Sequence, residues 1–98
     1  MTHAPFDAHL HDGRLYGRGS ADMKGGIAAF LSAALGMIER IREGPGLSLV
    51  ITAGEETGCE GAAKVVDDAR ARQLLGAVGA LLVGEPTGNQ PLLGHKGA

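Results

Sequence analysis

Apolar residues recur at helical spacing in two stretches of this 98-residue chain. From Met23 to Ile41 they fall three and four positions apart, which predicts an amphipathic helix. The helix is expected to stop near Gly44-Pro45-Gly46, where proline and two glycines coincide. Between Gly61 and Leu75 a second apolar set with the same spacing alternates with charged residues, so another amphipathic helix is expected there.

Two shorter runs are apolar at nearly every position and therefore predict strands covered on both faces. The first spans residues 47–53 and is rich in β-branched side chains, and the second spans residues 80–83. Gly54 and Gly84 follow these runs directly. Strands that alternate with helices of this length indicate βαβ units. The expected fold class is therefore α/β, with a mostly parallel sheet and flanking helices.

The composition of the chain limits the kinds of protein it can be. The hydrophobic content of 44% suits one small domain, but aromatic residues make up only 3%, so its core would be thin. A net charge of −2 without a basic stripe argues against nucleic-acid or membrane-surface partners, and no apolar run reaches the ~20 residues of a membrane span. The single cysteine, Cys59, excludes an internal disulfide and favours a reducing, cytoplasmic setting.

Acidic residues follow the two predicted strands and precede the first helix. Glu55 and Glu56 come after the first strand, Glu85 comes after the second, and Asp22 lies just before the first helix. Ligands of open α/β sheets bind outside the carboxyl ends of the strands, so these carboxylates are expected to converge. Any one of them alone is more often a helix cap or a solvated loop residue. The set as a whole points to a functional site.

The adjacent pair Glu55-Glu56 is the most informative element of this set. Two carboxylates in sequence repel each other unless a cation or solvent separates them. Neighbouring residues that leave a strand point in different directions, so one can bind a metal while the other acts as a general base. Zinc accepts carboxylate oxygens and lowers the pKa of a bound water to about 7, which suits metal-assisted hydrolysis. Cobalt is the alternative metal, because carboxylates discriminate poorly between the two.

Other residues allow two interpretations. The glycine-rich stretch 17–26 lacks the order of a phosphate-binding loop, so tight turns explain it better. His9 and His11 flank a polar turn and are expected to be solvated rather than metal ligands. Cys59 is expected to be an idle thiol rather than a nucleophile. Three residues stay open between an electrostatic or substrate-contacting role and plain solvation: Arg18, Lys24 and His95.

Three segments of the chain carry a family resemblance. Residues 12–26, 52–58 and 84–87 resemble, in order and approximate spacing, the acetylornithine deacetylase and succinyl-diaminopimelate desuccinylase group of M20 metallopeptidases. The resemblance implies a zinc-exopeptidase-like catalytic domain with two zinc ions. Asp22 would bridge the two ions, Glu55 would be the general base, and Glu56 and Glu85 would each bind one ion. It further implies a cis peptide bond between Asp22 and Met23.

The resemblance also implies that residues 1–98 form part of a catalytic domain. The family's HxD segment, its lid and dimerisation domain and its late histidine ligand have no match here, and residues 93–98 resemble the passage toward the lid. Each zinc ion would keep Asp22 and one glutamate, fewer than the three protein ligands usual for catalytic zinc. We therefore expect the isolated chain to be inactive.

The activity implied by the resemblance is hydrolysis of the amide bond of a small N-acyl amino acid by a homodimeric enzyme. Residues 84–87 and 94–97 resemble acetylornithine deacetylases slightly more than desuccinylases. An M20 carboxypeptidase or aminoacylase is the closest alternative, because it would share these motifs. A truncated, non-catalytic remnant is the alternative from a different class.

Overall fold

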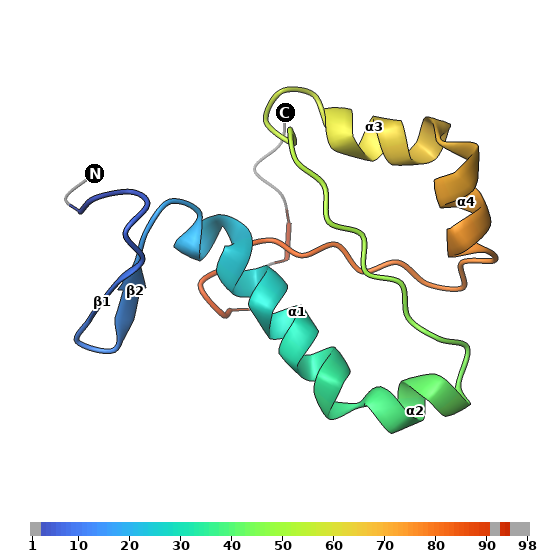
Figure 1. Ribbon diagram of the computed structural model, residues 1–98, viewed down its shortest axis with the longest axis horizontal. Helices are drawn as coiled ribbons and strands as arrows, with labels where there is room; N and C mark the ends of the chain where they lie inside the picture. Colours follow the sequence, from blue (N-terminus) through green and yellow to red (C-terminus); the bar gives the residue numbers. More distant parts are fainter. Residues whose placement is uncertain (1–2, 91–92, 95–98) are drawn as a thin grey trace. The chain divides into compact units, whose positions relative to one another are not determined.

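The computed structural model describes residues 3–90 and 93–94 of the chain, which divide into two units. The first unit comprises Met1–Ile38 together with Val83–Ala98, and the second comprises Glu39–Leu82. Each unit is described by itself below. Figure 1 shows the elements in chain order.

The first unit begins with a β-hairpin that the periodicity did not predict. Strands β1 (His9–His11) and β2 (Arg14–Tyr16) pair antiparallel, with Leu10 opposite Leu15. Asp12 and Gly13 connect them with positive φ angles of 48° and 71°. Asp-Gly is a favoured pair for this two-residue turn, because both positions require φ above zero. The polar Asp12-Gly13 pair was thus the available signal for the hairpin.

A helical turn and a helix follow the hairpin. The turn η1 (Ser20–Lys24) contains i to i−5 hydrogen bonds, and α1 (Gly25–Gly36) continues from it. Helix α2 (Ile38–Glu43), which belongs to the second unit except for Ile38, comes after a break at Met37, whose φ is −116°. Gly36 disfavours helix by about 1 kcal/mol relative to alanine, which accounts for the break at this point. The helix predicted over 23–41 is therefore present in two pieces, and it ends, as predicted, before Gly44-Pro45-Gly46.

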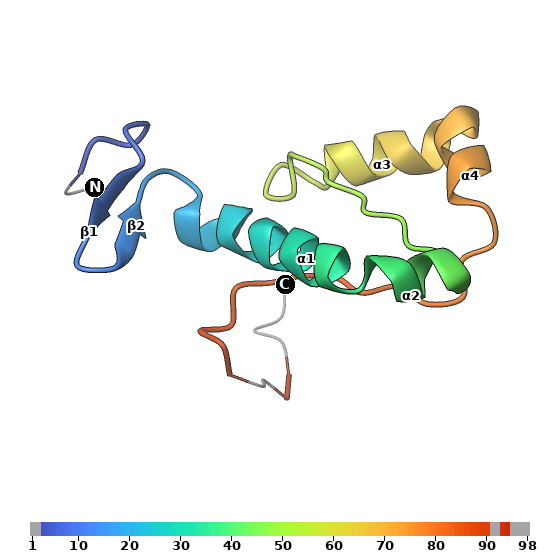
Figure 2. The same cartoon turned by 60° about the horizontal axis from the view of Figure 1, so that its bottom comes forward.

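The second unit contains the other predicted helix, again in two pieces. Helix α3 (Glu60–Asp67) and helix α4 (Ala69–Leu75) meet at Asp68, and Figure 2 shows the bend between them. Asp68 has extended backbone angles, and its Oδ1 accepts hydrogen bonds from the backbone N–H groups of Arg70 (2.7 Å) and Ala71 (3.1 Å). An aspartate in this position caps a new helix rather than continuing the old one.

The predicted parallel sheet is not present among residues 3–90 and 93–94. Their only sheet is the β1–β2 hairpin, and the segments 47–53 and 80–83 carry no strand assignment. A strand is defined by ladder hydrogen bonds to a neighbour, and neither segment has one within the described part of the chain. Their apolar side chains are correspondingly exposed, for example 44% for Leu49 and 83% for Leu82.

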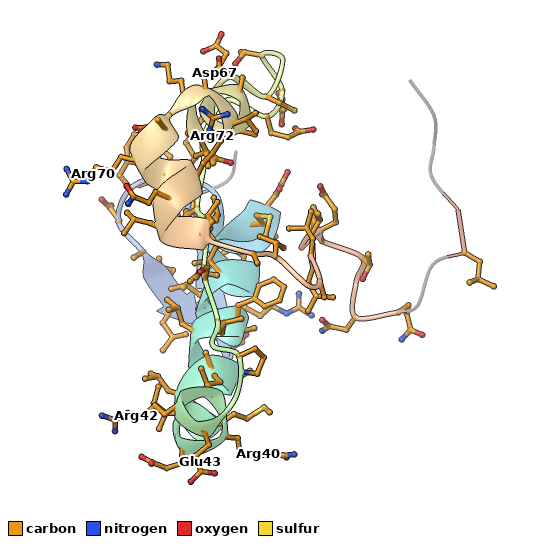
Figure 3. All side chains as sticks on the ribbon, turned by 90° about the vertical axis from the view of Figure 1, so that its right-hand side faces the viewer. Arg40, Arg42, Glu43, Asp67, Arg70 and Arg72 are labelled. Atoms are coloured by element: carbon orange, nitrogen blue, oxygen red, sulfur yellow. The ribbon has the colours of Figure 1, made fainter. Side chains whose placement is uncertain are left out.

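Apolar side chains gather in the second unit without forming a closed core. Residues 48–51 lie along α3 and α4, and the side chains of Leu49, Ile51, Val65 and Leu74 help to line an open apolar cavity of about 400 Å³. No side chain of the described residues is fully buried. Figure 3 shows Arg40 and Arg42 on opposite sides of α2 and Arg70 pointing away from α4.

Candidate metal and catalytic site

Asp22 lies on the turn η1, whose backbone hydrogen bonds fix its position. The N–H of Lys24 donates to the carbonyl oxygen of Gly19 at 2.8 Å, and the N–H of Gly25 donates to that of Ser20. Lys24 Nζ also donates to the carbonyl oxygen of Arg18 at 3.0 Å. The Asp22–Met23 peptide bond is cis, as the family resemblance implies. Asp22 itself is exposed, so its carboxylate is accessible to a ligand.

Glu85 belongs to the same unit, and the residue before it packs against one side chain from η1 and one from α1. A Cβ atom built on Gly84 would lie 3.0 Å from Cε of Met23 and 2.5 Å from Cε2 of Phe30. Figures 1 and 2 both show the segment that begins at Val83 passing beside the beginning of α1. Because Met23 follows Asp22 and Gly84 precedes Glu85, this contact brings the two predicted metal-binding segments together.

Glu55 and Glu56 lie on a tightly closed loop of the second unit, between residue 53 and α3. The carbonyl oxygen of Glu55 accepts the N–H groups of Gly58 (3.2 Å) and Cys59 (3.1 Å). Gly54, with a φ of 78° that favours glycine, leads the chain into this loop. These bonds leave both glutamate side chains exposed on one short turn.

Two further residues, which the sequence did not mark as part of the site, help to close this loop. Thr57 Oγ1 donates a hydrogen bond to the carbonyl oxygen of Gly54 at 3.1 Å, and the N–H of Gly61 donates to that of Ala53 at 3.1 Å. A threonine hydroxyl that bonds a carbonyl three residues back is a common local pattern, so Thr57 was a usable signal. Nothing in the sequence marked Gly61.

The four predicted site carboxylates are free of protein partners within the described residues. None accepts a hydrogen bond or forms an ion pair there; the ion pairs found join His11 to Asp12 and Arg42 to Glu39. Metal ions bind carboxylate oxygens that are not engaged by other groups, and the oxygens of these four side chains are unengaged within the described residues. No group of three or more potential ligands with metal-binding geometry occurs within residues 3–90 and 93–94. Asp22 and Glu85 belong to one unit, and Glu55 and Glu56 to the other.

The structure also describes most of the residues for which the sequence allowed two interpretations. His9 and His11 are exposed on β1, as expected, and their rings stack at 6.0 Å. Cys59 is exposed and its Sγ lies 3.7 Å from the carbonyl oxygen of Glu55, with no histidine partner in the described part of the chain. Lys24 contacts a backbone carbonyl rather than a carboxylate. His95 lies outside the described residues, as do residues 96–98 of the predicted passage toward a lid.

Comparison with known proteins decides the family. The model of Peptidase family M20/M25/M40 matches residues 1–95. The chain belongs to this family. The M20 chain is 47% identical to the succinyl-diaminopimelate desuccinylase of Rhodospirillum centenum over 92 residues, which cover 90% of the chain and 23% of that relative.

Further relatives carry the same name. The succinyl-diaminopimelate desuccinylase of Wigglesworthia glossinidia brevipalpis is 44% identical over 88% of the chain and 23% of its own length. The probable succinyl-diaminopimelate desuccinylase of Staphylococcus epidermidis is 37% identical over 99% of the chain and 23% of its own length. The M20 chain thus spans about a quarter of the length of the curated relatives it matches. No solved structure matches it.

Within the described residues, every helix is too short or too polar to cross a lipid bilayer.

Proposed function

We propose that the complete gene product is a zinc-dependent hydrolase that cleaves the amide bond of N-succinyl-diaminopimelate, releasing succinate and the free amine. The observation that carries the proposal is a set of four exposed carboxylates, on motifs of an M20 chain, that have no protein partners among residues 3–90 and 93–94. The relatives named as desuccinylases favour the succinyl substrate over N-acetylornithine, the substrate that residues 84–87 and 94–97 favoured slightly.

Each carboxylate has a separate role in this proposal. Asp22, Glu56 and Glu85 would hold the metal ions, with Asp22 shared between the two ions and each glutamate serving one of them. Zinc, when bound, supplies a Lewis acid for the amide carbonyl and acidifies the attacking water. Glu55 accepts a proton from that water and delivers it to the departing amine nitrogen as the carbon–nitrogen bond breaks. Adjacent positions on one closed turn suit this division, because the same short loop carries both residues while both side chains stay exposed.

The rest of the active site is proposed to come from other parts of the gene product. The chain would supply part of the catalytic domain, while the two histidine ligands and the lid and dimerisation domain would lie elsewhere. Residues 47–53 and 80–83 would then join a mostly parallel sheet, which would cover their exposed apolar side chains. The homodimeric state and the cytoplasmic location, which the single Cys59 favours, belong to the same proposal.

A substrate panel tests the proposal directly. The complete gene product is stripped of metal with a chelator, reloaded with zinc or cobalt, and assayed with N-succinyl-diaminopimelate, N-acetylornithine and a set of dipeptides. We expect metal-restored turnover, fastest with the succinyl substrate. Turnover of dipeptides alone would instead support an M20 carboxypeptidase, and turnover that survives complete metal removal would contradict the metal-dependent mechanism.

A further inference from the structure

Gly84 makes a close approach that a larger residue would not permit. A Cβ atom at this position would lie 2.5 Å from the ring of Phe30 on α1 and 3.0 Å from the end of Met23. Carbon atoms in van der Waals contact are about 3.5–4.0 Å apart, so both distances are too short for a methyl group. The backbone of residue 84 therefore rests directly on these two side chains.

We propose that Gly84, Phe30 and Met23 form a packing joint that sets the separation between the Asp22 and Glu85 carboxylates. We call these three residues the Gly84 joint, and its residues position metal ligands without binding metal themselves. The inference rests on the proposed function, because it assigns a role in the same metal site. It gives Gly84, Phe30 and Met23 a positioning role, whereas the motif chemistry concerns only the carboxylates.

The Gly84 joint is covalently linked to both predicted metal-binding residues. Gly84 is bonded to Glu85 and Met23 is bonded to Asp22, so a displacement at the contact passes to both ligand-bearing residues. Phe30 belongs to α1, and the backbone hydrogen bonds of that helix hold the Cα atom of Phe30 in place. Zinc–carboxylate distances are about 2.0–2.2 Å and tolerate only small errors, so a shift of about 0.5 Å is enough to disturb binding.

Alanine at position 84 would act through a steric clash of its methyl group and not through backbone strain. Gly84 is not among the glycines with positive φ, so alanine can adopt its backbone conformation. The flexible end of Met23 can move aside, but the ring of Phe30 is stiff and its Cε2 is the nearer atom. Relief must therefore come from a new ring position or from movement of the 84–85 backbone.

The chain offers a matched control. Gly79 also lies in the segment between α4 and the end of the described chain, has no positive φ, and has nothing within 4 Å of a built Cβ. Gly79→Ala makes the same chemical change without a steric consequence. A difference in zinc affinity between the two variants is then due to the contacts of the Gly84 joint and not to the general effect of replacing glycine.

The experiment measures zinc affinity of the complete gene product, by competition of zinc alone with a chromophoric chelator, beside kcat, KM and the thermal midpoint. We expect Gly84→Ala to weaken zinc binding by about 10- to 100-fold, the range for groups that orient metal ligands, and Gly79→Ala to change it by less than about twofold. Adding Phe30→Leu to Gly84→Ala makes room for the methyl group and is expected to recover most of the lost affinity. If Gly84→Ala does not fold, Phe30→Ala replaces it, with the exposed Leu35→Ala on the same helix as its control.

The outcomes separate the two proposals. Zinc binding by the unmodified protein together with equal affinity in Gly84→Ala and Gly79→Ala would overturn the joint alone. A lower thermal midpoint with unchanged zinc affinity would overturn it as well, because a merely structural glycine predicts that result. In the fallback pair, equal zinc affinity of Phe30→Ala and Leu35→Ala would have the same meaning. Failure of the unmodified protein to bind zinc would overturn the proposed function and, with it, the joint's role.

Discussion

A methyl group at Gly61 has no room beside the loop that carries Glu55 and Glu56. A Cβ atom there would lie 2.5 Å from the carbonyl oxygen and 2.9 Å from the nitrogen of Ala53, and 2.9 Å from Cβ of Thr52. Two of these atoms belong to the backbone, so no rotation of a side chain can relieve both contacts. The hydrogen bond from the Gly61 N–H to Ala53, at 3.1 Å, holds the two segments at this separation.

The sign of the Gly61→Ala effect depends on two opposing contributions. Alanine favours helix over glycine by about 1 kcal/mol, and Gly61 lies in the first turn of α3. Overpacking typically costs about 1–3 kcal/mol, and backbone neighbours place this site in the upper part of that range. The expected net result is a loss of about 1–2 kcal/mol in the free energy of unfolding. Gly36→Ala, at a helical position with nothing within 4 Å, is expected to gain a few tenths to about 1 kcal/mol.

The assay is urea denaturation of the complete gene product, with both variants compared to the unmodified protein in the same buffer. A second measurement follows hydrolysis, because movement of Ala53 passes through Gly54 to Glu55. We expect Gly61→Ala to lose both stability and kcat, and Gly36→Ala to keep both. Gly61→Ala with stability equal to or above that of Gly36→Ala would refute the account of how this loop is closed.

Three further predictions concern caps, the η1 turn and the isolated chain. Asp68→Ala removes the acceptor of two backbone N–H groups at the start of α4 and is expected to lower the free energy of unfolding by about 1 kcal/mol in a urea titration. Its control is Asp67→Ala, which is expected to be nearly neutral because Asp67 makes no such bonds in the described part of the chain. Lys24→Met removes the 3.0 Å hydrogen bond to the Arg18 carbonyl and is expected to lower the free energy of unfolding by less than about 1 kcal/mol, because the bond is exposed. Lys64→Met on α3 is the control. Equal thermal midpoints of the two variants would count against a role for Lys24 in holding η1. The isolated 98-residue chain is expected to show negligible hydrolysis, and zinc-dependent activity abolished by Glu55→Gln in that chain would contradict this expectation.

Helices were predictable from the sequence because their hydrogen bonds are local. The spacing of apolar residues located both helical stretches, and Gly44-Pro45-Gly46 marked the end of the first. The internal breaks were not predicted, although Gly36 and Asp68 are residues that favour helix ends. The periodicity also left the hairpin unassigned, since strands of three residues are too short to show alternation, and only Asp12-Gly13 indicated it.

Strands and the site depend on non-local partners, and there the sequence was less informative. The apolar runs 47–53 and 80–83 have strand composition, but the ladder neighbours that would make them a sheet do not occur in the described part of the chain. The four site carboxylates were predicted from their places beside the expected strands and helix and from motif order, and they stay a prediction. The cis bond after Asp22, which the family resemblance implies, is confirmed. The sequence placed Gly61 at the start of a helix and Gly84 after an apolar run, but it did not reveal their close contacts, because these depend on the space around each residue.

The central claim is that Glu55 acts as the base while the neighbouring carboxylates hold zinc, and one paired measurement tests it. Hydrolysis of N-succinyl-diaminopimelate and bound zinc are measured together for the complete gene product, for Glu55→Gln, and for Glu60→Gln as a control at the adjacent start of α3. We predict that Glu55→Gln retains its zinc but loses about 10²- to 10⁴-fold in kcat, while Glu60→Gln keeps both. Glu55→Gln with undiminished kcat, or with kcat lost only in proportion to lost zinc, would contradict the assignment of Glu55 as the base.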